Sequence, residues 1–197
     1  MARVSILMNA YNAQKYLKEA IDSIYNQTYT DWEIIFVDNC STDDTKKIVD
    51  SYDDKIKYYK TTNNIPLGAA RNFGIQYCTC EYLAFLDTDD IWLPNKLETQ
   101  VNVLDKDLNF QMCYGGVIYI NNKSDEIGRF LPDTKSGNVF AQQLIRYEIN
   151  MQSVLLRNNN IKINENLRHS PDFELFMNIA SKYNINVQKE YLVNIEN

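Results

Sequence analysis

The sequence predicts an α/β fold in which a mostly parallel central sheet is covered by helices on both faces. Two observations carry this prediction. In the first half of the chain, short and nearly continuous apolar runs alternate with segments whose apolar residues recur every three or four positions. In the second half, two apolar runs are joined by a short polar turn, which indicates a small antiparallel element at one edge.

The elements of the first half follow this alternation in order. Four apolar runs predict strands, at 4–8, 32–37, 56–59 and 82–86. Four periodic or capped segments predict helices, at 16–25, from 41–44 onward with a hydroxyl as the cap, at 69–77 and from Pro94 onward. On the last helix one buried face is expected to hold Leu97, Val101, Leu104 and Leu108.

The second half is predicted to be smaller. Apolar runs at 112–120 and 127–131 flank the polar turn 121–126 and predict an antiparallel pair. A helix at 139–147, a strand at 153–156 and a helix from Ser170 to about Tyr183 are expected to follow. A soft change in composition near residue 110 divides a single domain, 1–197, into the halves 1–108 and 109–197.

Composition excludes several classes of protein. The chain has 197 residues, 45% of them hydrophobic, which suits one domain with a real core and argues against disorder. Its formal net charge of −6 argues against a basic nucleic-acid-binding surface. The sequence contains no run of about 18 uncharged apolar residues, so it predicts no membrane-spanning helix.

The cysteines do not predict a zinc site. Cys78 and Cys80 are separated by one residue, and the single histidine, His169, is far from them in sequence. The apolar segment at the amino terminus meets Asn9 and Asn12 too early for a secretory signal. Four thiols without secretory features fit a reducing cytoplasm.

Acidic residues stand at the carboxyl ends of two predicted strands, where open parallel sheets bind ligands. Asp38 ends one strand, and Asp87, Asp89 and Asp90 follow another within four residues. Acids this close repel one another unless a cation neutralises them, and a divalent ion with oxygen ligands is the natural one. Arg71, on the preceding helix, can contact a phosphate. Taken in isolation, both segments also fit solvated turns.

The order and spacing of six segments carry more information than any one of them. These segments are Val4–Asn12, Tyr16–Ile24, Gln27–Tyr29, Glu33–Thr45, Gly68–Ile75 and Tyr82–Asp90. Together they closely resemble the family 2 glycosyltransferases, which have the GT-A type of Rossmann-like fold and belong to the nucleotide-diphospho-sugar transferase superfamily. The resemblance is dense over residues 3–108 and continues thinly to about 193.

The resemblance implies a donor site. Ala10, Tyr11 and Asn12 stand where the family's first loop contacts the nucleobase, with the aromatic ring packing on it. Asp38 matches the acid that accepts a hydrogen bond from the base, which is usually uracil, and Arg71 matches an arginine that reaches the nucleotide.

Asp87, Thr88 and Asp89 match the family's Asp-x-Asp motif. In the family the first acid commonly holds the ribose or sugar, and the last binds Mn²⁺ or Mg²⁺ on the diphosphate. Asp90 is a further candidate for orienting the sugar or the metal shell. Gln152 stands where the family often lines the acceptor side.

Asp172 falls on the family's catalytic base, which takes a proton from the acceptor hydroxyl. The glutamate that usually precedes this base is replaced by Pro171. Without the resemblance, Ser170 as a cap, Pro171 in the first turn and Asp172 at the positive end of the dipole would explain the segment as a helix start. Glu174 and His169 are further candidates for the base.

The resemblance implies an inverting, metal-dependent glycosyltransferase that moves a sugar from a nucleotide-diphosphate donor, a UDP-sugar, to a hydroxyl of a saccharide or lipid-linked acceptor. By analogy with bacterial members, we expect a cytoplasmic domain associated peripherally with the inner face of the membrane, and no nucleic-acid partner. The length predicts a compact catalytic domain, either naturally short or cut from a longer protein.

Other readings stay open. The substitution at Pro171 motivates a non-catalytic module that binds nucleotide sugars. A phosphatase with Asp87 as its nucleophile is disfavoured, because such a motif normally follows the first strand and here follows the fourth. The first loop lacks the Gly-rich stretch of a nucleotidyltransferase and the Gly-x-Gly-x-x-Gly of a dinucleotide-dependent oxidoreductase.

Overall fold

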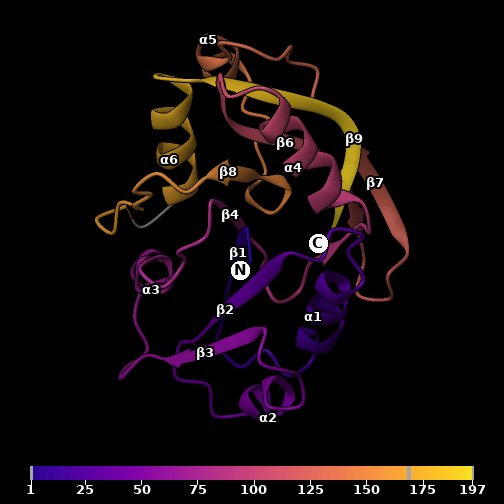
Figure 1. Ribbon diagram of the computed structural model, residues 1–197. Coiled ribbons are helices and arrows are strands. Elements are labelled where there is room, and N and C mark those ends of the chain that lie inside the picture. The colour runs from indigo at the N-terminus through magenta and orange to yellow at the C-terminus, as the bar shows by residue number, and fades with distance from the viewer. Residues whose placement is uncertain (1, 168–169, 197) are drawn as a thin grey trace.

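The computed structural model describes residues 2–167 and 170–196. These residues form one nine-stranded mixed sheet in the order β3-β2-β1-β4-β8-β6-β9-β5, with β7 paired to β6 (Figure 1). The strands of the first half are β1 (Val4–Ala10), β2 (Trp32–Asp38), β3 (Ile56–Lys60), β4 (Tyr82–Phe85) and β5 (Ile91–Trp92). Those of the second half are β6 (Phe110–Ile120), β7 (Glu126–Phe130), β8 (Leu155–Arg157) and β9 (Asn184–Glu196).

The first four strands confirm the parallel prediction. β1 pairs in parallel with both β2 and β4, and β2 pairs in parallel with β3. In this register Ala10 lies opposite Asp38, and Asp38 lies opposite Lys60. Because parallel strands end at the same edge, the loops that follow them meet there.

Helices cover both faces of the sheet, as predicted. They are α1 (Leu17–Tyr25), α2 (Thr45–Val49), α3 (Leu67–Ile75), α4 (Lys96–Lys106), α5 (Phe140–Ile145), α6 (Pro171–Ala180) and the short 3₁₀ helix η1 (Met151–Ser153). Alternate residues of the central strands point to opposite faces. Accordingly Ile6 packs in one core with α1 and α4, whereas its neighbour Leu7 packs in the other with α6.

The second half contains the predicted antiparallel pair, β6 with β7, and a long strand that we did not predict. β9 runs parallel to β6 and antiparallel to β5, and Figure 1 shows it curving across the second half to end near α1. β8 joins the two halves, since it pairs antiparallel with both β4 and β6. The sheet is therefore parallel from β3 through β4 and mixed elsewhere.

Three local predictions were wrong. Leu108 lies beyond the end of α4 and is 80% exposed, because the helix stops where Asp107 becomes extended (φ −135°, ψ 102°). Ser170 adopts a left-handed conformation (φ 48°, ψ 48°) and its side chain caps nothing among the described residues, although Pro171 does open α6. Before α2, the carboxylate of Asp43, not a hydroxyl, accepts the N–H of Thr45 at 3.0 Å.

The four cysteines are unpaired thiols. Within residues 2–167 and 170–196, no helix combines the length and apolarity needed to cross a membrane.

Candidate active site

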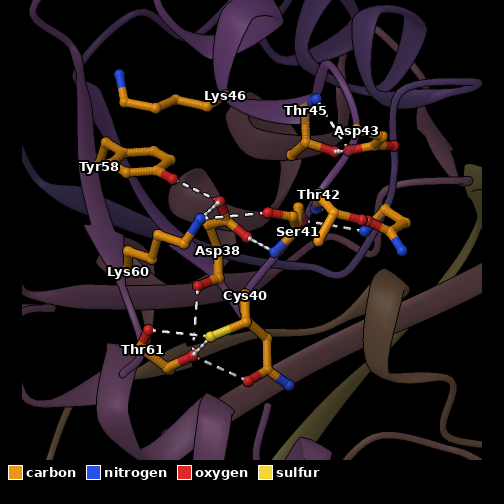
Figure 2. Close-up of polar contacts among 12 residues, drawn as sticks. Asp38, Cys40, Ser41, Thr42, Asp43, Thr45, Lys46, Tyr58, Lys60 and Thr61 are labelled. Atoms are coloured by element: carbon orange, nitrogen blue, oxygen red, sulfur yellow. Dashed lines mark hydrogen bonds and ion pairs between the residues drawn. The ribbon is translucent and has the colours of Figure 1, made fainter. Parts of the chain in front are cut away.

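Asp38, at the end of β2, has no exposed surface. Its carboxylate accepts the N–H of Ser41 at 2.6 Å and the hydroxyl of Tyr58 at 2.5 Å, and Lys60 Nζ lies 3.6 Å from Oδ2 (Figure 2). Burial alone would raise the pKa of Asp38, but these hydrogen bonds and the charge of Lys60 bring it below its ordinary value. Asp38 is thus a carboxylate that organises its own turn, and a ligand can reach it only when a covering side chain moves.

The loop after β1 is bonded to the loop after β2. The N–H of Asn12 donates to the hydroxyl of Ser41 at 3.0 Å, and the side-chain oxygen of Asn12 accepts the N–H of Thr42 at 2.9 Å. Asn12 has a left-handed backbone (φ 54°), which an asparagine tolerates better than most residues. Tyr11, beside it, is 57% exposed, so its ring is free to stack on a planar group.

The loop after β3 joins the same assembly. The amide of Asn39 donates to the carbonyl of Ile65 at 2.8 Å and accepts its N–H at 3.0 Å. Cys40 is held in a left-handed conformation (φ 68°), with its thiol 3.2 Å from the carbonyl of Thr61. Figure 2 shows Cys40 and Thr61 directly below Asp38. Three loops therefore form one bonded platform at the carboxyl edge of the sheet.

Sequence reasoning missed the polar residues of β3 that face Asp38. Tyr58 and Lys60 both stabilise its negative charge. The parallel pairing of adjacent strands places Lys60 opposite Asp38, so this partner was within reach of a register argument.

The acid cluster after β4 begins with Asp87, which is held by two side chains. One guanidinium nitrogen of Arg71 lies 3.0 and 3.2 Å from the two carboxylate oxygens. Gln152 donates to Oδ2 at 2.6 Å and accepts the backbone N–H of Asp87 at 2.9 Å. Arg71, predicted to reach the nucleotide, and Gln152, predicted on the acceptor side, thus both contact Asp87. Thr88 follows it and is half-buried.

The other two acids have different surroundings. Asp89 is exposed and lines a cavity of about 310 Å³ together with Lys15, Lys123 and Glu196. Asp90 is buried, and its Oδ1 accepts the N–H of Glu196 at 3.1 Å. Burial, followed by repulsion from Asp89 and Asp87, raises the pKa of Asp90 to about 8, and burial raises that of Asp89.

These carboxylates fit a cation only in part. Within the described residues, no group of three or more His, Cys, Asp or Glu side chains is arranged to hold a metal ion, and no ion pair neutralises Asp89 or Asp90. Mg²⁺ is often held by one or two carboxylates together with substrate phosphates and water. The exposed, unneutralised Asp89 suits that mode of binding.

Asp172 lies in the first turn of α6 and is half-buried. Burial, together with the negative charge of Asp172, raises the pKa of Tyr147. The ring of Phe173 packs edge-on against Tyr147, with centroids 4.9 Å apart. Glu174 lines a different cavity, with Lys162–Asn166. His169 lies outside the described residues.

Comparison with known proteins identifies one family. A family model described as glycosyl transferase family 2 matches residues 5–166. An Escherichia coli protein named UDP-Glc:alpha-D-GlcNAc-diphosphoundecaprenol beta-1,3-glucosyltransferase WfgD is 40% identical over 135 residues, which are 67% of this chain and 52% of that one. A Rickettsia typhi protein described as an uncharacterized glycosyltransferase is 34% identical over 192 residues, 91% of this chain and 60% of that one.

Solved structures agree on the fold. The crystal structure of residues 1–349 of S. aureus TarS in complex with UDP superposes with a TM-score of 0.82 at 21% identity, covering 100% of this chain and 61% of that one. The chain spans about half to three-fifths of the length of these relatives.

Proposed function

The chain belongs to glycosyltransferase family 2, and from this membership we propose that it moves a sugar from a UDP-sugar to a hydroxyl of a lipid-linked saccharide, with inversion and with a divalent cation. Two relatives support the choice of substrates. The name of WfgD specifies a UDP-glucose donor and a diphosphoundecaprenol-linked acceptor, and TarS has been crystallised with UDP and with UDP-GlcNAc.

The observation that carries the proposal is the strand order β2-β1-β4. In this order the loop after β1 lies between Asp38 and the acid cluster, so contacts with the base and contacts with the diphosphate would fall along one edge. Tyr11 would stack on the uracil, while Ala10 and Asn12 fix the loop that carries it. Asp38 would contact the base after Tyr58 or a neighbouring side chain moves, since its carboxylate is enclosed.

The acid cluster would hold the rest of the donor. Asp87, fixed by Arg71 and Gln152 and still partly exposed, can accept a hydrogen bond from a sugar or ribose hydroxyl, with Thr88 beside it. Asp89 would hold the divalent cation together with the donor phosphates, and Asp90 would shape the turn from inside. When bound, such a cation neutralises the charge that develops on the leaving diphosphate.

Asp172 would act as the general base. Its carboxylate takes the proton of the acceptor hydroxyl while the acceptor oxygen bonds to the anomeric carbon and the bond from that carbon to the diphosphate breaks. Attack from the face opposite the leaving group inverts the configuration. Pro171 is compatible with this role, because proline suits the first turn of a helix and leaves Asp172 in place.

A lipid-linked acceptor implies work at a membrane surface. We therefore extend the proposal to a single catalytic domain in the cytoplasm, associated peripherally with the inner face of the membrane. Glu174 and His169 remain proposals for acceptor-side residues.

The test separates donor binding from transfer. Thermal shift with UDP and Mn²⁺ should show stabilisation of the wild type and of Asp172→Asn, and little stabilisation of Asp89→Asn. Sugar transfer from UDP-glucose to a GlcNAc-diphospholipid should fall at least about 100-fold in Asp172→Asn, the usual scale for loss of a general base. Exposed Asp54→Asn serves as the charge-matched control. Stabilisation by UDP without turnover of any nucleotide sugar by the wild type would identify a binding module instead.

A further inference from the structure

Gln152 is the only side chain besides Arg71 that the described residues place on the carboxylate of Asp87. Its two hydrogen bonds differ in direction: the amide nitrogen donates to the carboxylate, and the amide oxygen accepts the backbone N–H of the same residue. Together they fix both the backbone and the side chain of Asp87. A carboxylate cannot replace this pair, because an ionised carboxylate has no proton to donate.

Buried side chains donate hydrogen bonds to the segment that carries Gln152. Three consecutive carbonyls, those of Gln152, Ser153 and Val154, each accept a hydrogen bond from a different donor. The donors are Trp92 Nε1 at 3.1 Å, Gln100 Nε2 at 2.8 Å and Lys96 Nζ at 3.2 Å. All three donor residues are buried.

The three donors come from two consecutive elements, because Trp92 ends β5 and the other two lie on α4. Trp92, Lys96 and Gln100 are four residues apart, and the last two lie one turn apart on α4. Lys96 also donates to Gln100 Oε1 at 2.7 Å, and its nitrogen lies 4.1 Å from the centroid of the Trp92 ring. Such an internally bonded row resists displacement, since each broken bond would leave a buried polar group unpaired.

We propose that Gln152 is a positioning residue for sugar transfer, and that Trp92, Lys96 and Gln100 form a buried clamp that fixes Gln152 so that Asp87 is aimed at the donor. This inference rests on the proposed role of Asp87 in holding the donor. In the absence of the clamp, Asp87 would keep its ion pair with Arg71 but lose the contacts that set its backbone. The clamp explains why a neutral glutamine stands beside an acid cluster whose members repel one another.

The main test compares Gln152→Leu with Gln152→Glu in the full protein. Gln152→Leu removes both hydrogen bonds and should lower kcat/KM for the UDP-sugar about 10- to 100-fold at every pH. Gln152→Glu should lose as much at pH 8 but recover several-fold toward pH 5.5. A neighbouring acid and burial favour the protonated form of the new carboxyl, which again donates to Asp87. Exposed Gln142→Glu should match the wild type across the range.

A second variant tests the buried clamp directly. Lys96→Met keeps most of the side-chain volume but cannot donate to Val154, and it should lower kcat/KM for the donor about 3- to 10-fold while the variant remains folded by circular dichroism. The inference fails if both Gln152 variants keep wild-type kcat/KM, or if Gln152→Glu shows the flat pH profile of Gln152→Leu. Loss of the proposed function is a separate outcome, because the wild type would then show no transfer at all.

Discussion

The side-chain nitrogen of Lys96 lies 3.2 Å from the carbonyl oxygen of Val154, and no carboxylate within the described residues pairs with this buried ammonium. Burial lowers the pKa of Lys96 to about 7, from an ordinary value of 10.5. Between these two pH values the unfolded chain binds a proton that the folded protein has released. The free energy of unfolding must therefore rise with pH across that window.

Lys96→Met should remove this rise. Measured by urea unfolding, the stability of the wild type relative to the variant should grow by about 3 kcal/mol between pH 7 and pH 9.5. Exposed Lys47→Met provides the control, and its stability should stay at a constant offset from the wild type. A constant offset for Lys96→Met as well would show that the Lys96 side chain keeps its ordinary proton affinity.

The contribution of Asp90 to stability should change with pH in the opposite direction to that of Lys96. Its pKa is about 8 in the folded protein against 3.8 for an ordinary aspartate, chiefly because it is buried. The folded protein therefore binds the extra proton, and stability falls as the pH rises from about 4 to about 8. In chelator-containing buffer, Asp90→Asn should be more stable than the wild type at pH 8 by about 1–3 kcal/mol and should lose that advantage near pH 4. If stability changed with pH in the same way for Asp90→Asn and Asp54→Asn, the raised pKa of Asp90 would be contradicted.

The left-handed backbone of Cys40 predicts a stabilising glycine. At a φ of 68° a side chain costs about 1 kcal/mol that glycine avoids. Cys40→Ala and Cys40→Gly both remove the thiol contact with Thr61, so their difference isolates the backbone term. We expect Cys40→Gly to be more stable than Cys40→Ala by about 1 kcal/mol in chemical denaturation. If Cys40→Ala were the more stable variant, the left-handed backbone at residue 40 would impose no energetic penalty on a side chain.

The guanidinium of Arg71 is buried, and we nevertheless expect its removal to weaken donor binding. Arg71→Met leaves Asp87 without its cation and increases the repulsion among the acids of the cluster, which are proposed to hold the donor. We expect UDP binding in the presence of Mn²⁺, measured by calorimetry, to weaken about 10- to 100-fold. Arg129→Met removes an exposed arginine from β7 and should bind UDP as the wild type does.

The first half of the fold could be predicted because its central strands, β1, β2 and β4, are buried on both faces. Every residue of Trp32–Asp38 is buried, and the sequence indicates this by the apolar run at 34–37. The long strand β9 carries no such run. Its pairing with β6 shifts between Val187 and Tyr191, so the intervening Gln188–Glu190 segment interrupts the alternation on either side of it.

The sequence predicted where the acids of the candidate site lie on the sheet, but not which side chains contact them. The ends of β2 and β4 placed Asp38 and Asp87 at one edge, as the topology confirms. The partners of Asp87 are 16 and 65 residues away in sequence. No periodicity links an amide such as Gln152 to a carboxylate at that separation, so only the folded chain reveals the pair.

The path of β9 also determines when the acid cluster can be completed. The bond between Asp90 and Glu196 joins residues 106 positions apart, and β9 pairs with β6 along almost its whole length. Contacts of such long range form late in folding, because the entropy of closing the loop must be overcome first. A chain emerging from the ribosome can assemble β1 to β4 and the platform around Asp38 while the turn at Asp90 still lacks its partner. The platform around Asp38 would thus be built first, and the acid cluster would be completed only when β9 pairs.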